Sequence, residues 1–453
     1  MIAPTVASEV ASEVGADAAD AAYRGRVDEC LRQAIADGVT TWSALLARAE
    51  GADPRLVATC LRSGGLTVSG MHVRSSRPAS RSASRSTSRL ALPPGSGPSS
   101  RWNPELHARD FEWYFTPRCA RALAARAVAI GPRVLCMGTP TVAFALLDQN
   151  ASLGDASLGD ASLGDASLGD ASLGDVSLGR TALARLTLVD RNPLVDRRHP
   201  GAGSIEHLTG DLAAVRVEAG LYDVAIFDAP WYPAVLQRWL AVAARAVRPG
   251  GRVLFALLPR LHRPLAMDDR SVTLCAARRL GRVEIEPGAL RYESPLFETE
   301  ALATTGLAVP PQWRRADLVQ LWVEHVPPPI EPNEPSTSEP TWARFVIGPQ
   351  VVHLDVDTTP EPGEILTPID DRADFRYASI STREPRRAQI NLWTSRSRVA
   401  RVRRPGLVAN LLERLAQAGD FRALDDAPAL NALSPPARRR LLDALGLLLG
   451  TGE

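Results

Sequence analysis

Residues 222–233 of the chain read YDVAIFDAPWYP, and this stretch decides how the middle of the sequence is interpreted. The apolar run VAIF predicts a strand that is buried on both faces, as in a parallel sheet. Asp228 follows at once, with two prolines and two large aromatic residues ahead of a helical stretch. Ligands bind at the carboxyl ends of strands in open parallel sheets, so the stretch is a candidate site. The alternative is a strand-to-helix turn in which Asp228 caps the helix and Pro230 opens it.

The same pattern recurs on both sides of this stretch. From Trp102 to about Val326, short apolar runs alternate with helical stretches, and the runs are RVLCMG, ARLTLVD, GRVLFALLP and DLVQLWVEH. Such alternation is typical of βαβ units, which build a mostly parallel sheet with helices on both faces. The sequence therefore predicts an α/β, Rossmann-like domain over residues 102–326.

Glycine and acidic residues stand at the ends of neighbouring predicted strands. Gly138 and Thr139 follow RVLCM, and a glycine there lets the backbone approach a ligand closely. Asp190 follows LTLV, where an acid commonly accepts hydrogen bonds from ribose hydroxyls. Further on, Asp211 in HLTGDL is placed to accept from an adenine amino group. The order of these residues predicts a site for an adenosine-containing cofactor.

This run of residues resembles the class I S-adenosylmethionine-dependent methyltransferases, from about Phe111 to Val323. Within that class, DAPW at residues 228–231 is similar to the D-P-P-[YFW] motif of the amino-methyltransferases, which methylate exocyclic amines of adenine or cytosine in DNA and RNA. The resemblance implies a Rossmann-like methyltransferase core, S-adenosylmethionine as the cofactor, and an N-methyltransferase that acts on a planar substrate such as a nucleobase in DNA or RNA.

The resemblance also implies a role for each residue of the motif. Asp228 accepts one N–H of the substrate amine, and the carbonyl of Ala229 accepts the other. Pro230 stiffens the turn, and Trp231 stacks on the flat substrate. Ala229 stands where the motif has a proline, so it contributes only its backbone.

An upstream segment, FEWYFTPRCARALA, resembles the TP helix start that precedes the cofactor strand in the same enzymes. There Thr116 is expected to cap the helix and Pro117 to occupy its first turn, where the helix start helps to hold the methionine end of the cofactor. Arg314, Arg315 and Asp317, at the start of LVQLWVEH, are weaker candidates for flanking the site.

Two other functions stay open. The winged-helix-like N-terminus, VLCMGTPTVAFALL and the DAPWYP loop together resemble the branched-polyamine aminopropyltransferases, which act on polyamines with decarboxylated S-adenosylmethionine. Those enzymes have GDDDL-like acids after the first strand, whereas this chain has GTPTV, which ranks that reading second. The other alternative is a non-catalytic, methyltransferase-like interaction protein.

The flanking segments divide the chain into further parts. Helix, turn, helix and a possible hairpin over residues 23–72 are similar to a winged helix. Because its second helix offers only Arg55 and Arg62 for phosphate contacts, a packing module is favoured over a nucleic-acid reader. The remaining expected parts are a mobile tail (1–22), a Ser/Arg-rich linker (73–101), a pentapeptide-repeat insertion forming a surface loop (150–180), a Pro-rich linker (327–341) and a C-terminal α+β domain (342–453) through which a protein partner could bind.

Composition bounds the function classes. The chain has 453 residues and a net charge of +1, which argues against a generally basic nucleic-acid coat. It contains no lysine, so a lysine nucleophile or Schiff base is excluded. Its five cysteines are dispersed without metal-ligand spacing, so no metal is expected. The N-terminus does not read as a signal peptide and no stretch reads as a membrane span, so the sequence predicts a cytoplasmic protein without membrane contact.

Overall fold

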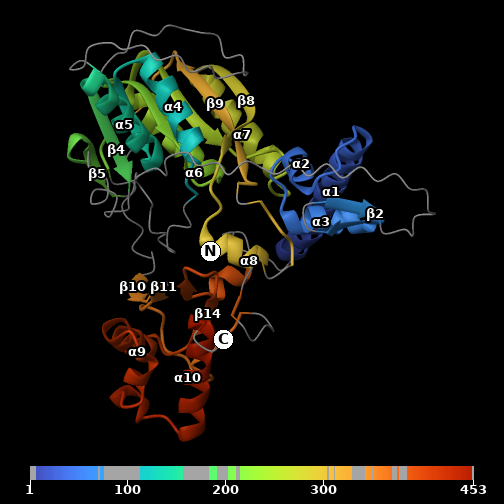
Figure 1. Cartoon of the computed structure of the whole chain (residues 1–453), viewed down its shortest axis with the longest axis vertical. Coiled ribbons are helices and arrows are strands. Elements are labelled where there is room, and N and C mark those ends of the chain that lie inside the picture. The colour runs from blue at the N-terminus through green and yellow to red at the C-terminus, as the bar shows by residue number, and fades with distance from the viewer. Residues whose placement is uncertain are drawn as a thin grey trace. The chain divides into compact units, whose positions relative to one another are not determined.

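Figure 1 shows the computed structural model of the chain, which divides into two compact units. The first unit holds the N-terminal residues and the central sheet, and the second holds the C-terminal residues together with Ser294–Pro311. The structure describes residues 7–69, 72–75, 113–156, 183–190, 202–210, 215–303, 306–310, 312–328, 342–348, 350–369, 375–376 and 385–450.

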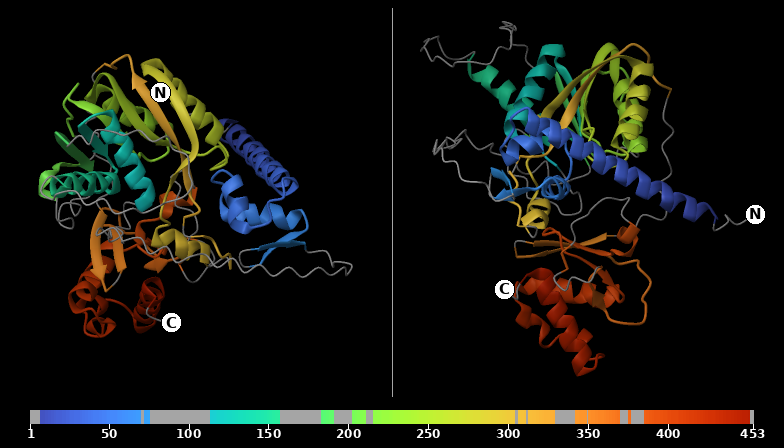
Figure 2. Two further views of the ribbon diagram at one scale, coloured as in Figure 1. Left: turned by 45° about the horizontal axis from the view of Figure 1, so that its top comes forward. Right: turned by 90° about the vertical axis from the view of Figure 1, so that its right-hand side faces the viewer.

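The first unit begins with three helices and an antiparallel hairpin, which we call the N-terminal module. Its elements are α1 (Ala7–Ala36), α2 (Trp42–Arg48), α3 (Pro54–Ser63), β1 (Leu66–Ser69) and β2 (His72–Ser75). Helix α1 lies along α2 and α3 (Figure 2). Helix α1 already begins at Ala7, inside the segment 1–22 that the sequence predicts to be a mobile tail. Alanine has the strongest intrinsic helix preference, which accounts for the longer helix.

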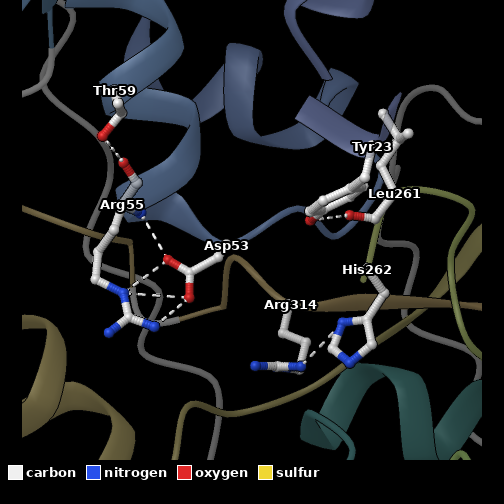
Figure 3. A network of polar contacts seen from close by, with 7 residues as sticks. All are labelled: Tyr23, Asp53, Arg55, Thr59, Leu261, His262 and Arg314. Carbon is white, nitrogen blue, oxygen red and sulfur yellow. Dashed lines mark hydrogen bonds and ion pairs between the residues drawn. The ribbon is translucent and has the colours of Figure 1, made fainter. Parts of the chain in front are cut away.

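The start of α3 is as the sequence predicts. Asp53 is its N-cap and accepts a hydrogen bond from the backbone N–H of Arg55 (2.7 Å), while Pro54 stands in the first turn and Gly64 follows the last. The Arg55 guanidinium is itself paired with the Asp53 carboxylate (Figure 3). One of the two arginines that α3 offers for phosphate contacts is therefore already engaged, which favours the packing interpretation.

The centre of the first unit is a seven-stranded sheet in the order β5-β4-β3-β6-β7-β9-β8. Neighbours from β5 to β7 are parallel, whereas β9 runs antiparallel between β7 and β8. The strands are β3 (Arg133–Met137), β4 (Arg185–Asp190), β5 (Glu206–Thr209), β6 (Tyr222–Phe227), β7 (Val247–Leu257), β8 (Gly281–Arg291) and β9 (Arg315–Val323). The strand order reverses between β3 and β6, so their carboxyl ends mark the topological switch point of a Rossmann-like α/β fold.

Helices cover both faces of this sheet, as expected for mostly parallel strands. They are α4 (Pro117–Ile130), α5 (Pro140–Ala156), α6 (Pro233–Ala246) and α7 (Ala266–Leu280). Helices α4 and α5 pack together on one face, and α6 and α7 on the other (Figures 1 and 2). Every residue of β6 is buried, with Ala225 and Phe227 in the core beneath α6 and α7. The prediction of a strand buried on both faces is confirmed.

The edge of the sheet differs from the sequence-based expectation in two respects. The run DLVQLWVEH forms β9, but as an antiparallel strand. Strand β8 was not predicted at all, because its exposed and half-exposed residues alternate along an edge strand and leave no apolar run.

The pentapeptide repeat begins differently from the expected surface loop, since its first copy continues helix α5 to Ala156. Residues 157–180, the rest of the predicted loop, lie outside the described residues.

The second unit contains a five-stranded antiparallel sheet in the order β10-β11-β13-β14-β12. Its elements are β10 (Trp342–Ile347), β11 (Gln350–Asp355), β12 (Leu366–Thr367), β13 (Leu392–Thr394), β14 (Val399–Val402), α9 (Pro405–Ala418) and α10 (Pro435–Leu449). The two helices lie against this sheet (Figure 2) and share one buried apolar cluster with it, so this is an α+β domain. Helix α8 (Leu296–Ala303) belongs to this unit, although the expected boundary placed it in the 102–326 domain.

Short 3-10 helices connect several of these elements, and they are η3 (Ala202–Ser204), η4 (Pro385–Gln389), η5 (Phe421–Leu424) and η6 (Pro428–Leu430). Most of both predicted linkers, residues 76–101 and 329–341, lies outside the described residues. The hairpin extends past the expected boundary at residue 72, since β2 ends at Ser75. Among the helices that the structure describes, none combines the length and apolarity that crossing a bilayer requires.

Candidate functional site

Asp228 directly follows β6 at the switch point of the sheet. Its backbone N–H reaches the carbonyl of Met137 (3.4 Å), which holds it beside the end of β3. Helix α6 begins only at Pro233, with Tyr232 as its N-cap. Two details of the turn interpretation of DAPWYP are therefore wrong: Asp228 does not cap the helix, and Pro230 lies before the helix instead of opening it.

The carboxyl group of Asp228 has an unusual proton affinity. Burial raises its pKa to about 7, and the side chains of Tyr292 and Trp231 partly oppose the rise as hydrogen-bond donors. Both donors are neutral, so they compensate the desolvated charge less than a cation would. A carboxyl group that exchanges its proton near neutral pH, at a switch point, is a candidate for acid–base work.

Trp231 is held on two sides by aromatic rings. His262 meets its ring at 88° with the centroids 4.9 Å apart, and Tyr292 meets it at 75° and 6.0 Å. Edge-to-face contacts at such distances favour one ring orientation. The guanidinium of Arg263 also donates a hydrogen bond to the backbone carbonyl of Trp231. Trp231 is therefore an oriented aromatic next to Asp228.

Ala229 and Pro230, between these two residues, have different environments. Ala229 is buried in the core beneath α6, and Pro230 is exposed. The carbonyl of Pro230 accepts a hydrogen bond from the N–H of Tyr232 (2.7 Å), which closes a tight turn. The side chain of Ala229 thus serves packing, and any role towards a ligand is left to its backbone.

Tyr292 brings the start of α4 to the same place. It follows β8 and pairs with Phe115, whose ring centroid lies 4.9 Å from that of Tyr292. The hydroxyl of Thr116 accepts a hydrogen bond from the N–H of Cys119 (3.2 Å), and Pro117 occupies the first turn, so the predicted cap of α4 is confirmed. Burial raises the pKa of the Cys119 thiol, and the charge of Asp228 adds to that rise.

The turn after β3 is built mainly by packing. Gly138 has φ +60°, and a Cβ there would lie 2.9 Å from the ring of Trp239. The hydroxyl of the buried Thr139 donates to the carbonyl of Ile226 (3.4 Å). Packing therefore accounts for Gly138, and a hydrogen bond within the fold accounts for the side chain of Thr139.

Asp190 ends β4, the strand next to β3, and is buried. It lies at the same carboxyl-end edge of the sheet as Asp228, where an acid can accept from the hydroxyls of a ribose. Asp211 lies outside the described residues. A buried acid at the end of β4 is a candidate for the ribose part of a nucleoside cofactor.

Two arginines, Arg314 and Arg263, lie beside the aromatic part of this site. Nδ1 of His262 lies 3.4 Å from the guanidinium of Arg314 (Figure 3). Burial, then the charges of Arg314 and Arg263, hold the pKa of His262 well below its usual range. The imidazole is therefore neutral at physiological pH, and the cations beside it are the two arginines.

The other two charged candidates near β9 are Arg315 and Asp317, and their contacts are within the protein fold. Asp317 is buried in an ion pair with Arg270 (2.7 Å) and accepts a hydrogen bond from the N–H of Gly288. Burial, followed by the charge of Arg291, lowers the pKa of Arg315. Asp317 therefore stabilises the sheet edge.

Sequence reasoning missed two residues of the site, His262 and Tyr292. His262 lies shortly after β7, so reading the residues beyond GRVLFALLP as closely as those beyond VAIF would have found it. Tyr292 had no such signal, because β8 was not recognised. Within the described residues, no group of three or more His, Cys, Asp or Glu side chains is arranged to hold a metal ion.

No family model and no curated protein matches the chain. Among solved structures, the branched-chain polyamine synthase of Thermus thermophilus is 16% identical with a TM-score of 0.44, and the match covers 68% of this chain and 89% of that one. A 16S rRNA N2 methyltransferase of the same organism is 16% identical (TM-score 0.25, 52% and 46% covered), and an S-adenosylmethionine-dependent methyltransferase of Mesorhizobium loti is 16% identical (TM-score 0.26, 45% and 97% covered). At these TM-scores the similarities carry no argument, so the Rossmann-like fold of the core rests on its own strand order.

Proposed function

We propose that the core is an S-adenosylmethionine-dependent N-methyltransferase that acts on an amine of a planar substrate, with a nucleobase in DNA or RNA as the first choice. The observation that carries this proposal is the pairing of Asp228 with Trp231 at the switch point. A carboxyl group with a pKa of about 7 stands there beside an oriented aromatic ring. An amine on a flat ring needs both a proton acceptor and a stacking surface.

The cofactor would lie along the carboxyl ends of β3 and β4. Asp190 would accept from its ribose hydroxyls, and the backbone around Gly138 and Thr139 would lie against it. Thr116 and Pro117 would present the start of α4 to its methionine end. Asp211 would bind its adenine amino group. When bound, S-adenosylmethionine supplies a methyl group activated by the sulfonium.

Asp228 would orient the attacking amine. Its carboxylate would accept one N–H and the carbonyl of Ala229 the other, which draws the nitrogen towards a tetrahedral geometry and makes its lone pair available for attack. The pKa of about 7 leaves a large fraction of the carboxyl groups ionised at neutral pH and able to take up a proton from the amine. Trp231 would stack on the substrate ring, a contact that contributes about 1–3 kcal/mol per base.

A polyamine acceptor fits these surroundings less well. Arg314 and Arg263 lie beside the ring of His262, and both lower its pKa by charge repulsion. The charge of Arg314 would repel a polycation and attract a phosphate, whereas the charge of Arg263 is already paired with the carboxylate of Asp269 (2.7 Å). No observation on the described residues favours the aminopropyltransferase alternative. The role of the C-terminal domain, including a protein partner, stays a prediction.

Calorimetric titration with S-adenosylmethionine is the first test, with Asp190→Asn as the matched variant. We expect binding by the wild type and weaker binding by Asp190→Asn, because the amide offers the ribose only one acceptor oxygen. Absence of binding at millimolar cofactor would overturn the methyltransferase and leave the aminopropyltransferase, which uses the decarboxylated cofactor, and the non-catalytic interaction protein.

The second test measures transfer of a labelled methyl group to single-stranded DNA, RNA and free nucleosides. An assay with decarboxylated cofactor and spermidine runs in parallel. Methyl incorporation into a base amine would support the proposal, and product in the spermidine assay alone would replace it with the aminopropyltransferase.

A further inference from the structure

One loop of the core holds Trp231 in place. Residues 258–265, which we call the β7–α7 loop, connect β7 to α7. In this loop His262 meets the Trp231 ring edge-on, and Arg263 donates to the Trp231 carbonyl. The Arg263 guanidinium is itself fixed by the buried carboxylate of Asp269 (2.7 Å). The orientation of Trp231 therefore depends on where this loop lies.

The N-terminal module binds the backbone of this loop at several points. The buried hydroxyl of Tyr23 donates to the carbonyl of Leu261 (2.9 Å), and the N–H of Leu261 donates to the carbonyl of Glu50 (3.3 Å). Arg26 of α1 donates to the carbonyl of Pro264 (3.1 Å). Figure 3 shows the hydroxyl of Tyr23 directed at the loop. These bonds satisfy polar backbone groups of Leu261 and Pro264.

The turn between α2 and α3 also contacts the β7–α7 loop, at Pro259 and at the ring of His262. Gly51 has φ +84°, and a Cβ there would lie 2.8 Å from Cγ of Pro259. The backbone of Gly51 also hydrogen-bonds the ring of His262. Since Arg314 can only donate, Nδ1 of His262 accepts, and the neutral ring carries its proton on Nε2. The imidazole is thus fixed from both sides.

We propose that the N-terminal module is a positioning element of the acceptor site, which holds the β7–α7 loop so that His262 and Arg263 keep Trp231 oriented beside Asp228. The assignment of an acceptor to this place rests on the proposed function, but the mechanical link does not. The module contacts this loop at the backbone of Leu261 and Pro264, and His262 of the same loop meets the Trp231 ring. The module therefore acts on substrate binding through contacts inside the protein.

Two glycines of the module provide a matched pair of variants. Gly51 and Gly38 both have φ +84°, so alanine introduces the same backbone strain at either position. A Cβ at position 51 would press on Pro259, whereas a Cβ at position 38 would meet nothing within 4 Å. Any difference between Gly51→Ala and Gly38→Ala therefore reports the contact with the loop.

Hydrogen exchange of the full chain, followed by mass spectrometry, measures the link. We expect Gly51→Ala to speed exchange by about tenfold in peptides covering 258–265 and also 228–235, with β3 unchanged. Gly38→Ala should leave both peptides at the wild-type rate. Unchanged exchange at 228–235 in Gly51→Ala, or equal effects of the two variants, would overturn the proposal. Tyr23→Phe, which removes the hydroxyl bond to Leu261 together with the bond to the backbone of Asp53, gives the same test if Gly51→Ala fails to fold.

Calorimetry with S-adenosylhomocysteine separates this inference from the proposed function. Gly51→Ala should bind it as the wild type does, because the module does not contact the β3–β4 edge through this loop. A selective loss of S-adenosylhomocysteine binding in Gly51→Ala would contradict a role confined to the acceptor site. If the wild type binds none, the proposed function fails, while the exchange result still decides whether the module positions the Trp231 loop.

Discussion

Two aspartates at opposite ends of β6 show what each edge of the sheet does. Asp223, near the start of the strand, has its carboxylate paired with Arg133 (2.8 Å) and Arg248 (2.6 Å). The hydrogen bond from Arg133 is the main cause that lowers the pKa of Asp223 to about 2. At the other end, burial raises the pKa of Asp228 to about 7. At pH 7, Asp223 is therefore fully ionised, whereas Asp228 is about half protonated.

The difference separates stability from chemistry. A carboxylate with two cationic partners gains free energy by staying charged, so it strengthens the fold. A buried carboxyl group with neutral donors costs stability when it ionises, and such groups persist mainly at functional sites. In parallel sheets the carboxyl-end edge is where ligands bind, which agrees with the place of Asp228.

A glycine lies near each of the two acids, and close packing explains both glycines. A Cβ on Gly131 would lie 2.4 Å from Cβ of Asp223, and a Cβ on Gly138 would lie 2.9 Å from the ring of Trp239. Both glycines are thus required by close packing at opposite edges of the sheet. A glycine after a strand is therefore weak evidence for a ligand.

The largest effect should come from Asp228→Asn. The amide keeps the size of the side chain but cannot take up a proton, so methyl transfer should fall about 10²–10⁴-fold. Cofactor affinity, measured by calorimetry, should stay at the wild-type value. Full turnover in this variant would show that Asp228 has no catalytic role.

The reverse pattern is expected for Asp223→Asn. Loss of the charge paired with Arg133 and Arg248 should lower the free energy of unfolding by about 2 kcal/mol at pH 7, as urea denaturation would show. Binding of S-adenosylmethionine should be unchanged, since this edge lies at the opposite end of the strands. A variant as stable as the wild type would show that the two ion pairs contribute nothing.

Trp231→Ala sharpens the account of the carboxyl-end edge. Removal of the stacking surface should raise the KM for a base-containing acceptor about 5–150-fold, equivalent to 1–3 kcal/mol, with little change in cofactor affinity. Trp231→Phe should lose much less, because a smaller ring still stacks. Equal losses in the two variants would point to a packing role for the indole.

The smallest effect is expected at an exposed ion pair. Arg126 of α4 contacts Glu286 of β8, and both side chains are well exposed. Arg126→Gln should change stability by less than about 1 kcal/mol, because solvent screens such pairs. This variant is the control for Asp223→Asn in the same denaturation experiment, and a loss of similar size would show that burial does not distinguish the two pairs.

The sequence predicted the parallel core because its strands are short apolar runs with helices between them. The ends of β3, β4 and β6 could be read directly, and with them Gly138, Asp190 and Asp228. The cap at Thr116 was also predictable, since Thr-Pro is a local helix-start signal.

The rest of the site depends on contacts between segments that are distant in sequence. Tyr292 reaches Asp228 only because β9 inserts antiparallel between β7 and β8, which places the end of β8 at the carboxyl-end edge. The hydrogen bond from Tyr23 to Leu261 joins residues that are 238 positions apart in the sequence. No local pattern carries such information, so neither residue could be found from spacing or composition.

The pH dependence of stability tests the comparison most directly. Asp228 has a pKa of about 7 in the folded protein and an ordinary value of 3.8, so the folded state binds the proton more tightly. Its contribution is full below pH 4 and is lost as the pH rises through 7. The shift of Asp223 has the opposite sign, since its contribution is present above pH 4 and is lost as the pH falls towards 2.

The decisive measurement is the free energy of unfolding of the full chain in urea, read at β6 by hydrogen exchange, for the wild type and Asp228→Asn from pH 5 to pH 8. The account predicts that the variant gains stability relative to the wild type by about 3 kcal/mol across this range, because only the wild type must ionise a buried carboxyl group. A difference between the two proteins that does not change with pH would contradict the central claim that Asp228 holds its proton near neutrality.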